Sequence, residues 1–151
     1  MITTRNLDHI LKKNPVTKHF FVGTYPSCIQ PISKRETYAF ITNTDEHDAN
    51  GEHWNCWWVH GDKVIFFDSF GRPPYDSCFP SHYTDIIDGF RNVEYSGLQI
   101  QGPKSKACGY FCIHFIYIFS LGLNMKSFFN DYCNDFEIND MLVYDIVDSL
   151  N

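Results

Sequence analysis

Hydrophobic and polar residues follow one another along this chain in patterns that predict both helices and strands. Residues 3–13 carry apolar side chains at helical spacing and stop at Asn14-Pro15, which predicts a short amphipathic helix with one face on the core. Runs rich in β-branched and aromatic residues predict short strands at residues 20–22, 36–43, 92–95 and 98–100. The polar segment from Thr44 to Glu52 is expected to be a surface loop.

The clearest local pattern is a β-hairpin. Two apolar runs, residues 53–60 and 63–68, flank the turn dipeptide Gly61-Asp62. His53 and Asp68 stand at the outer ends of this hairpin. If the strands pair in simple register, the two residues are cross-strand neighbours whose side chains meet on one face. A carboxylate in that place raises the pKa of the imidazole and orients it, as a base paired with a thiol requires.

The second half of the chain is dominated by helical patterns. Residues 107–121 are apolar almost throughout, too apolar for a surface helix, which predicts a buried one. Further helices are expected at residues 83–90, 125–132 and 138–150. Together with the strands they predict an α+β fold.

Composition agrees with a globular protein. The 151 residues are 44% hydrophobic and 17% aromatic, and the length favours a single domain spanning residues 1–151. The longest apolar run, residues 111–123, is interrupted by polar residues and glycine, so no membrane span is expected. The N-terminus lacks the apolar core of a secretory signal. A reducing compartment is therefore expected, and the six cysteines are interpreted as reduced.

The net charge of −6 argues against a general nucleic-acid binder, because neutralising phosphates needs a basic surface. Basic residues cluster in two places, Lys12-Lys13 with Lys18 and Lys104 with Lys106. Both clusters are interpreted as solvated faces.

A cysteine marks the point where residues 101–115 change from a polar turn into the apolar helical run. Cys108 would lie in the first helical turn, where unpaired backbone N–H groups and the helix dipole stabilise a thiolate. It is therefore the candidate nucleophile. Gly109 beside it leaves room for a substrate backbone, and the Gln101 amide is a candidate donor for an oxyanion hole.

Each candidate has an ordinary structural explanation when it is taken alone. A cysteine at the head of an apolar helix is often a buried filler, His53 could be a surface histidine, and Asp68 could form a turn. His60, the rival base, lies at the hairpin turn away from Asp68. His82 and His114 are better explained by capping or packing.

A zinc site is the alternative chemistry for the apolar helix, which carries Cys108, Cys112 and His114. Residues four apart share a helix face, but His114 lies about 200° around the helix from Cys112. One ion cannot easily take all three side chains. No metal site is therefore expected.

The order His53, Asp68, Gln101, Cys108 and the sequence around each residue resemble the adenovirus endopeptidase (adenain) family. This family of cysteine proteases shares its clan with the SUMO-specific proteases. The resemblance runs from about residue 20 to about residue 120. The matching segments are FVGTY at 21–25, Asn43-Thr44, GEHW at 51–54, DSFG at 68–71 and QGPKSKACGYFC at 101–112.

The resemblance implies a fold and a role for each residue. It implies a papain-like α+β fold of the adenain and SUMO-protease type. In that fold a central mixed sheet is flanked by helices, and the nucleophile sits at the N-terminus of a buried helix. His53 would be the base, Asp68 the residue orienting it, Gln101 the oxyanion-hole donor and Cys108 the nucleophile. Gly51, Trp54 and Gly109 would contact the substrate.

Two departures from the family concern activation. The adenovirus enzyme has a further cysteine before the glutamine, which joins an activating viral peptide by a disulfide, but between Cys78 and Cys108 this chain has none. The resemblance leaves an activating peptide and DNA as candidate cofactors. The peptide would bind without a disulfide tether, and the acidic net charge weakens the expectation of DNA. No other cofactor is expected.

The resemblance also implies a function. The chain would be a cysteine endopeptidase that cleaves viral precursor proteins of a DNA virus at Gly-containing sites during virion maturation, in the virion and the interior of the host cell. The alternatives are a protease that removes SUMO or ubiquitin-like proteins and a catalytically silent binding module of the same fold.

Overall fold

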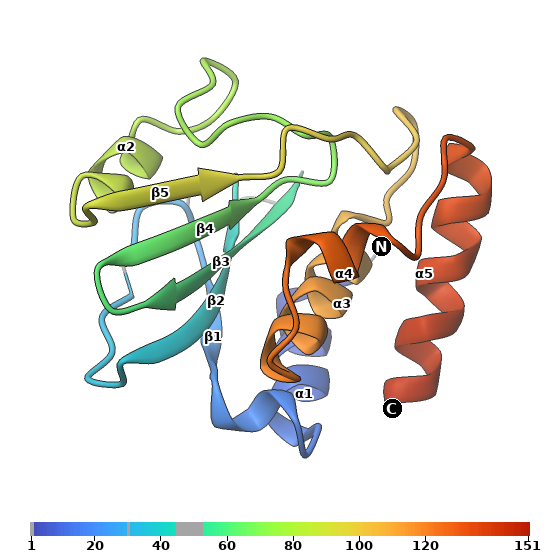
Figure 1. Cartoon of the computed structure of the whole chain (residues 1–151), viewed down its shortest axis with the longest axis horizontal. Coiled ribbons are helices and arrows are strands. Elements are labelled where there is room, and N and C mark those ends of the chain that lie inside the picture. Colours follow the sequence, from blue (N-terminus) through green and yellow to red (C-terminus); the bar gives the residue numbers. More distant parts are fainter. Residues whose placement is uncertain (1, 30, 45–52) are drawn as a thin grey trace.

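The computed structural model describes residues 2–29, 31–44 and 53–151, and within them the chain forms a five-stranded mixed sheet (Figure 1). The strands lie in the order β1-β2-β3-β4-β5. The outer pairs β1–β2 and β4–β5 are parallel, and the inner pairs are antiparallel. The bounds are β1 Phe21–Tyr25, β2 Thr37–Asn43, β3 Trp54–His60, β4 Lys63–Phe67 and β5 Asn92–Tyr95.

Helices cover both faces of the sheet (Figure 1). The helix α2 packs on one face, and α1, α3, α4 and α5 lie on the other, with α5 at the outside beside α3. The bounds are α1 Thr4–Lys13, the 3-10 turn η1 Thr17–His19, α2 His82–Ile87, α3 Cys108–Ser120, α4 Met125–Phe129 and α5 Phe136–Leu150.

Because side chains alternate between the faces of a strand, the mostly apolar run of β3 supplies both halves of the core. Trp54, Cys56 and Trp58 pack toward α3, whereas Trp57 and Val59 pack toward α2. The apolar character of β3 on both sides therefore follows from its central place between two covered faces.

The helix α3 is apolar around most of its circumference because the sheet, α1 and α5 surround it. This position confirms the expected buried helix. The amphipathic helix α1 begins at a capping box formed by Thr3 and Asn6, which satisfies backbone N–H groups at its start. It buries Leu7 and Leu11 against the core, as the pattern predicted.

The predicted hairpin is present, with His60 paired to Lys63 across the Gly61-Asp62 turn. This register determines which side chains meet at the open end of the hairpin.

The strand predicted at residues 98–100 was wrong. Gly97 has a φ of 63°, which turns the chain out of strand geometry after β5. Ile100 and Gln101 instead donate backbone hydrogen bonds to the single carbonyl of Ser69. This contact holds the segment that leads to α3 beside the end of β4.

Among the described residues no helix combines the length and apolarity needed to cross a membrane, and the cysteines there form no disulfide. Most of the predicted loop at residues 44–52 lies outside the described residues.

Candidate active site

Cys108 is the first residue of α3, and it is 4% exposed. At a helix start the first backbone N–H groups have no partner within the helix, so they and the helix dipole favour an anion there. The sulfur of Cys108 therefore lies at the positive end of the helix dipole. The helix packs on β3, which brings this sulfur to the start of that strand.

His53 immediately precedes β3 and contacts both predicted partners. Its Nε2 lies 2.5 Å from Oδ1 of Asp68, and its imidazole is also hydrogen-bonded to the side chain of Cys108. Because Nε2 is taken by the carboxylate, Nδ1 is the ring nitrogen left for the contact with Cys108. Burial by itself lowers the pKa of His53, but the hydrogen bonds and charges of Asp68 and Cys108 raise it to about 9. The imidazolium form is therefore favoured.

Asp68 is buried, and five donor atoms from Arg72, Asn55 and His53 hold its carboxylate. Arg72 donates to Oδ2 from its Nε at 2.8 Å and from its backbone N–H at 3.1 Å. Asn55 Nδ2 donates to Oδ1 at 2.9 Å, beside His53. Burial raises the pKa of Asp68, yet the hydrogen bonds from His53 and Arg72 outweigh this effect and lower it. The carboxylate is therefore ionised and oriented.

Sequence reasoning missed Asn55. It placed His53 directly across from Asp68, but the register pairs His60 with Lys63 and Cys56 with Phe67. One step further along that register brings Asn55 opposite Asp68, and His53 reaches the carboxylate diagonally. Counting pairs outward from the two-residue turn would have found Asn55.

Gln101 is 1% exposed, and other residues hold its amide. Its Oε1 accepts a hydrogen bond from Ser69 Oγ at 2.5 Å. Its Nε2 donates to the carbonyl of Ser105 at 2.8 Å and lies 3.3 Å from Ser105 Oγ. Gln101 is not among the residues that line the cleft beside Cys108, so its role as an oxyanion donor stays a prediction.

A cavity of about 480 Å³ opens beside Cys108 and His53. The Phe70 ring stacks on the His53 imidazole with centroids 5.1 Å apart and covers it from one side. Lys104 and Lys106 are exposed on the loop before α3, so the rim of this cleft carries positive charge although the chain is acidic. The cleft is lined by Thr44, His53, Phe70, Arg72, Cys78, Phe79, residues 103–106 and Cys108.

Two of the residues expected to contact substrate, Trp54 and Gly109, are not among the residues that line this cleft. Trp54 is buried in the core on the α3 side. A Cβ at Gly109 would lie 2.3 Å from Ile2 Cγ2 and 3.1 Å from Trp54 Cδ1. Close packing of α3 on β3 therefore explains why Trp54 is buried and why residue 109 is a glycine. Contact of these two residues with substrate stays a prediction. Gly51 lies outside the described residues.

His114, which the sequence explained by packing, is held by a tyrosine. His114 is buried, and its Nδ1 is 2.6 Å from the Tyr132 hydroxyl. Burial lowers the pKa of His114 to about 4, although the charge of Asp131 opposes the shift. No three His, Cys, Asp or Glu side chains cluster as metal ligands in the parts of the chain that the structure describes.

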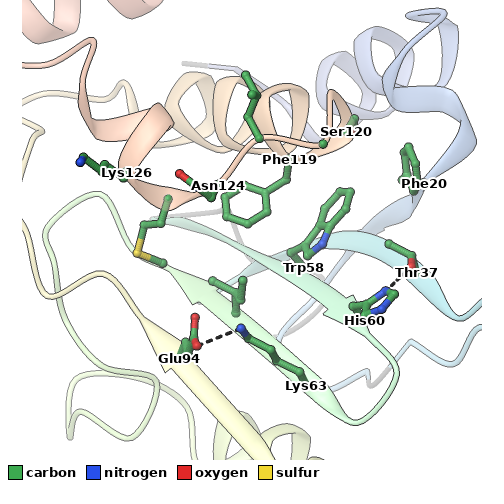
Figure 2. A pocket seen from close by; sticks show the side chains of 14 residues that line it. Phe20, Thr37, Trp58, His60, Lys63, Glu94, Phe119, Ser120, Asn124 and Lys126 are labelled. Carbon is green, nitrogen blue, oxygen red and sulfur yellow. Dashed lines mark hydrogen bonds and ion pairs between the residues drawn. The ribbon is translucent and has the colours of Figure 1, made fainter.

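A second cavity, of about 610 Å³, lies at the opposite end of α3 (Figure 2). Trp58 and Phe119 form part of its apolar lining, and the Lys63–Glu94 ion pair, 2.9 Å long, lies at its rim. His60, the rival base, lines this cavity and bonds to Thr37 at 2.6 Å. His60 is therefore separated from the cysteine cleft.

Comparison with known proteins agrees with this geometry. A protease of bovine adenovirus 2 is 29% identical over 112 residues, covering 66% of this chain and 55% of that protein. A protease of human adenovirus B serotype 3 is 27% identical over 113 residues, covering 66% of this chain and 54% of that protein. This chain is similar to the adenovirus proteases. The resemblance expected from the sequence is confirmed, although the chain spans only about half the length of these relatives.

Solved structures confirm the expected fold. The crystal structure of the ASFV pS273R protease matches with a TM-score of 0.60 at 16% identity, covering 95% of this chain and 66% of that one. The structure of its selenomethionine form matches with a TM-score of 0.59. The chain has the fold of that protease. In this chain the mixed sheet is flanked by helices, and Cys108 begins the buried helix α3. No protein-family model matches the sequence.

Proposed function

We propose that this chain is a cysteine endopeptidase in which Cys108 is the nucleophile and His53 the general acid and base. The contact of the His53 imidazole with both Cys108 and Asp68 carries the proposal. Such a constellation activates a thiol for attack on a carbonyl carbon. The relatives named as proteases support the same activity.

The reaction begins from an ion pair in which the proton of Cys108 already lies on His53, as a thiolate beside an imidazolium held by Asp68. The thiolate attacks the scissile carbonyl carbon, and the carbonyl oxygen becomes an oxyanion. The backbone N–H of Cys108 at the helix start is one donor for this oxyanion, and we propose Gln101 as the second. Collapse of the tetrahedral intermediate breaks the scissile C–N bond, and the leaving amine takes its proton from His53.

The second half of the reaction regenerates the enzyme. His53 removes a proton from water as the water oxygen attacks the thioester of Cys108. The C–S bond then breaks, the carboxylic product leaves, and the thiolate is restored. Every proton transfer in this cycle uses His53, and Asp68 stays ionised throughout.

We further propose that the substrates are viral precursor proteins cleaved at Gly-containing sites, within virions and the interior of infected cells. The similarity to adenovirus proteases supports this substrate class. Small residues at the cleaved bond suit a cleft in which Phe70 covers one side of His53. The positive rim formed by Lys104 and Lys106 would favour acidic residues nearby in the substrate.

The test is incubation of the purified chain with a mixed peptide library, followed by mass spectrometry of the new termini. Cleavage is expected from the wild type and from Cys133→Ala, which removes an exposed thiol outside the cleft. No cleavage is expected from Cys108→Ala with unchanged circular dichroism. Cleavage by Cys108→Ala would overturn the assignment of the nucleophile.

The same assay, run also with conjugates of ubiquitin-like proteins, separates the alternatives. Exclusive release of Gly-Gly-terminated ubiquitin-like proteins, with no cleavage within the library peptides, would identify a deconjugating protease. A silent binding module would cleave neither substrate and would react slowly with iodoacetamide at pH 6, whereas an activated Cys108 reacts fast. Parallel reactions with added DNA, or with peptides from viral precursors, test the cofactors that the resemblance implies.

A further inference from the structure

A chain of four hydrogen bonds connects the core beneath α2 to the carboxylate of the candidate site. Trp57 Nε1 donates to Thr42 Oγ1 at 2.9 Å, and Thr42 Oγ1 donates to the Tyr83 hydroxyl at 2.8 Å. The Tyr83 hydroxyl donates to Asn55 Oδ1 at 2.9 Å. Asn55 Nδ2 then donates to Asp68 Oδ1 at 2.9 Å. The chain joins β2, β3 and α2 to the end of β4.

The chemistry of its two ends determines the direction of this chain. An indole N–H can only donate, so Thr42 accepts from Trp57 and its own proton goes to Tyr83. An ionised carboxylate can only accept, so the amide of Asn55 must turn its N–H toward Asp68. Its Oδ1 then faces Tyr83 and receives the hydroxyl proton. All four donors therefore point toward Asp68.

The four residues Thr42, Asn55, Trp57 and Tyr83 are fully buried. Burial raises the pKa of Tyr83, so its hydroxyl keeps the proton that it donates to Asn55. In a buried site an unpaired polar group is costly, and each hydrogen bond polarises the next one. A rotated Asn55 amide would place its carbonyl oxygen against the carboxylate and leave Tyr83 without an acceptor. The network thus permits one orientation.

The surroundings of Tyr83 do not require a hydroxyl for packing. Its ring lies 5.2 Å from the Trp57 ring and 5.7 Å from the Phe66 ring, centroid to centroid, in an apolar cluster. A phenylalanine would fill the same space. The hydroxyl of Tyr83 donates to Asn55 and fixes the orientation of its amide, and the Asn55 amide in turn donates to Asp68.

We infer that Asn55, Tyr83 and Thr42 are positioning residues for the proposed reaction, aligning Asp68 Oδ1 with His53 through this one-way chain of hydrogen bonds. The inference rests on the proposed function and deepens it. Arg72 holds Oδ2 and also reaches Oδ1 with its Nη2 at 3.3 Å, whereas Asn55 holds Oδ1 from the core side. The two contacts together prevent the carboxylate from rotating away from the imidazole.

The test uses Tyr83→Phe, which removes only the hydroxyl, and Tyr38→Phe as the matched control in the same apolar cluster. Tyr83→Phe is expected to lower kcat about tenfold, the equivalent of one lost hydrogen bond, with KM unchanged. Thr42→Val should also lower kcat, whereas Thr42→Ser, which keeps the hydroxyl, should have a kcat close to that of the wild type. The double variant Thr42→Val/Tyr83→Phe should lose no more than Tyr83→Phe alone, because both act through Asn55.

A second measurement does not depend on catalysis. The proton between His53 Nε2 and Asp68 gives a downfield proton NMR signal while the pair is aligned. Tyr83→Phe is expected to broaden or shift this signal, and Tyr38→Phe should leave it in place. If Tyr83→Phe keeps both the wild-type signal and the wild-type kcat, or if Tyr38→Phe causes the same changes, the inference is overturned. If the wild type cleaves no peptide, the proposed function fails, but the NMR comparison still decides whether the chain aligns the pair.

Discussion

Asn55 lies across the open end of the β3–β4 hairpin from Asp68 and donates a 2.9 Å hydrogen bond to the same carboxylate oxygen that His53 uses. This oxygen therefore has one partner from the cleft and one from the core, and Arg72 Nη2 adds a longer contact at 3.3 Å. Arg72 binds the other oxygen. The carboxylate that orients the candidate base is thus held on every side by donors, which explains how a buried Asp68 stays ionised.

The charge of His53 predicts how cleavage depends on pH. The pKa of His53 is raised to about 9, so the imidazolium that protonates the leaving amine is lost as pH rises through that value. Cleavage should fall above pH about 9, while alkylation of Cys108 by iodoacetamide, which needs only the thiolate, should persist. Asp68→Asn should move the fall in cleavage to lower pH. A wild-type profile that stays flat to pH 10 would contradict this assignment.

The same shift predicts a stability effect. Because the pKa of His53 in the folded protein lies above its ordinary value of 6.5, the paired imidazolium stabilises the fold fully below pH 6.5. That contribution should disappear as pH rises through about 9. Urea unfolding at pH 6 and pH 10 checks this, and His53→Ala should show a smaller difference between the two pH values.

Gln101 is expected to be the oxyanion donor. Gln101→Glu keeps the size of the side chain but replaces its N–H donors, so kcat should fall by about 10² with little change in KM. Single-turnover kinetics should place the loss in the acylation step. Unchanged kcat in Gln101→Glu would leave the backbone N–H of Cys108 as the donor and remove Gln101 from the mechanism.

Gly109 is expected to be required for packing. A Cβ at this position would meet Ile2 Cγ2 at 2.3 Å and Trp54 Cδ1 at 3.1 Å, so Gly109→Ala should destabilise the fold by about 1–3 kcal/mol. Ile2→Ala in the same chain should recover part of this loss, because it removes the closest atom. Urea unfolding of the two single variants and the double variant measures the coupling. Strictly additive effects would contradict the predicted overlap.

His114 should make the protein sensitive to acid. Burial lowers its pKa to about 4, so below pH 6.5 the unfolded chain binds a proton that the folded protein does not. Stability should therefore fall between pH 6.5 and 4, by about 3 kcal/mol for this residue. His114→Gln should reduce this loss, whereas His9→Gln, at an exposed histidine, should not. Equal acid sensitivity in all three proteins would show that His114 is not responsible.

The sequence by itself predicted the elements that local rules control. The helical spacing along α1, the apolar and aromatic runs of β2 and β3, the Gly61-Asp62 turn and the apolar α3 all followed from spacing and composition, and the structure confirms them. The segment from Gln101 to Cys112 also identified the resemblance to adenovirus proteases. These features are determined locally because the backbone geometry of a turn or a helix depends on few neighbouring residues.

Only the tertiary structure decided which side chains meet. Local spacing does not show that Thr42, Tyr83 and Asn55 form one hydrogen-bond chain, since they come from three elements and their contact depends on how α2 packs on the sheet. The same holds for Gly109, which spacing suggested was open to substrate and which packing closes against Ile2 and Trp54. Contacts between elements far apart in sequence arise from the packing of whole surfaces, and that packing is what brings Cys108 to His53.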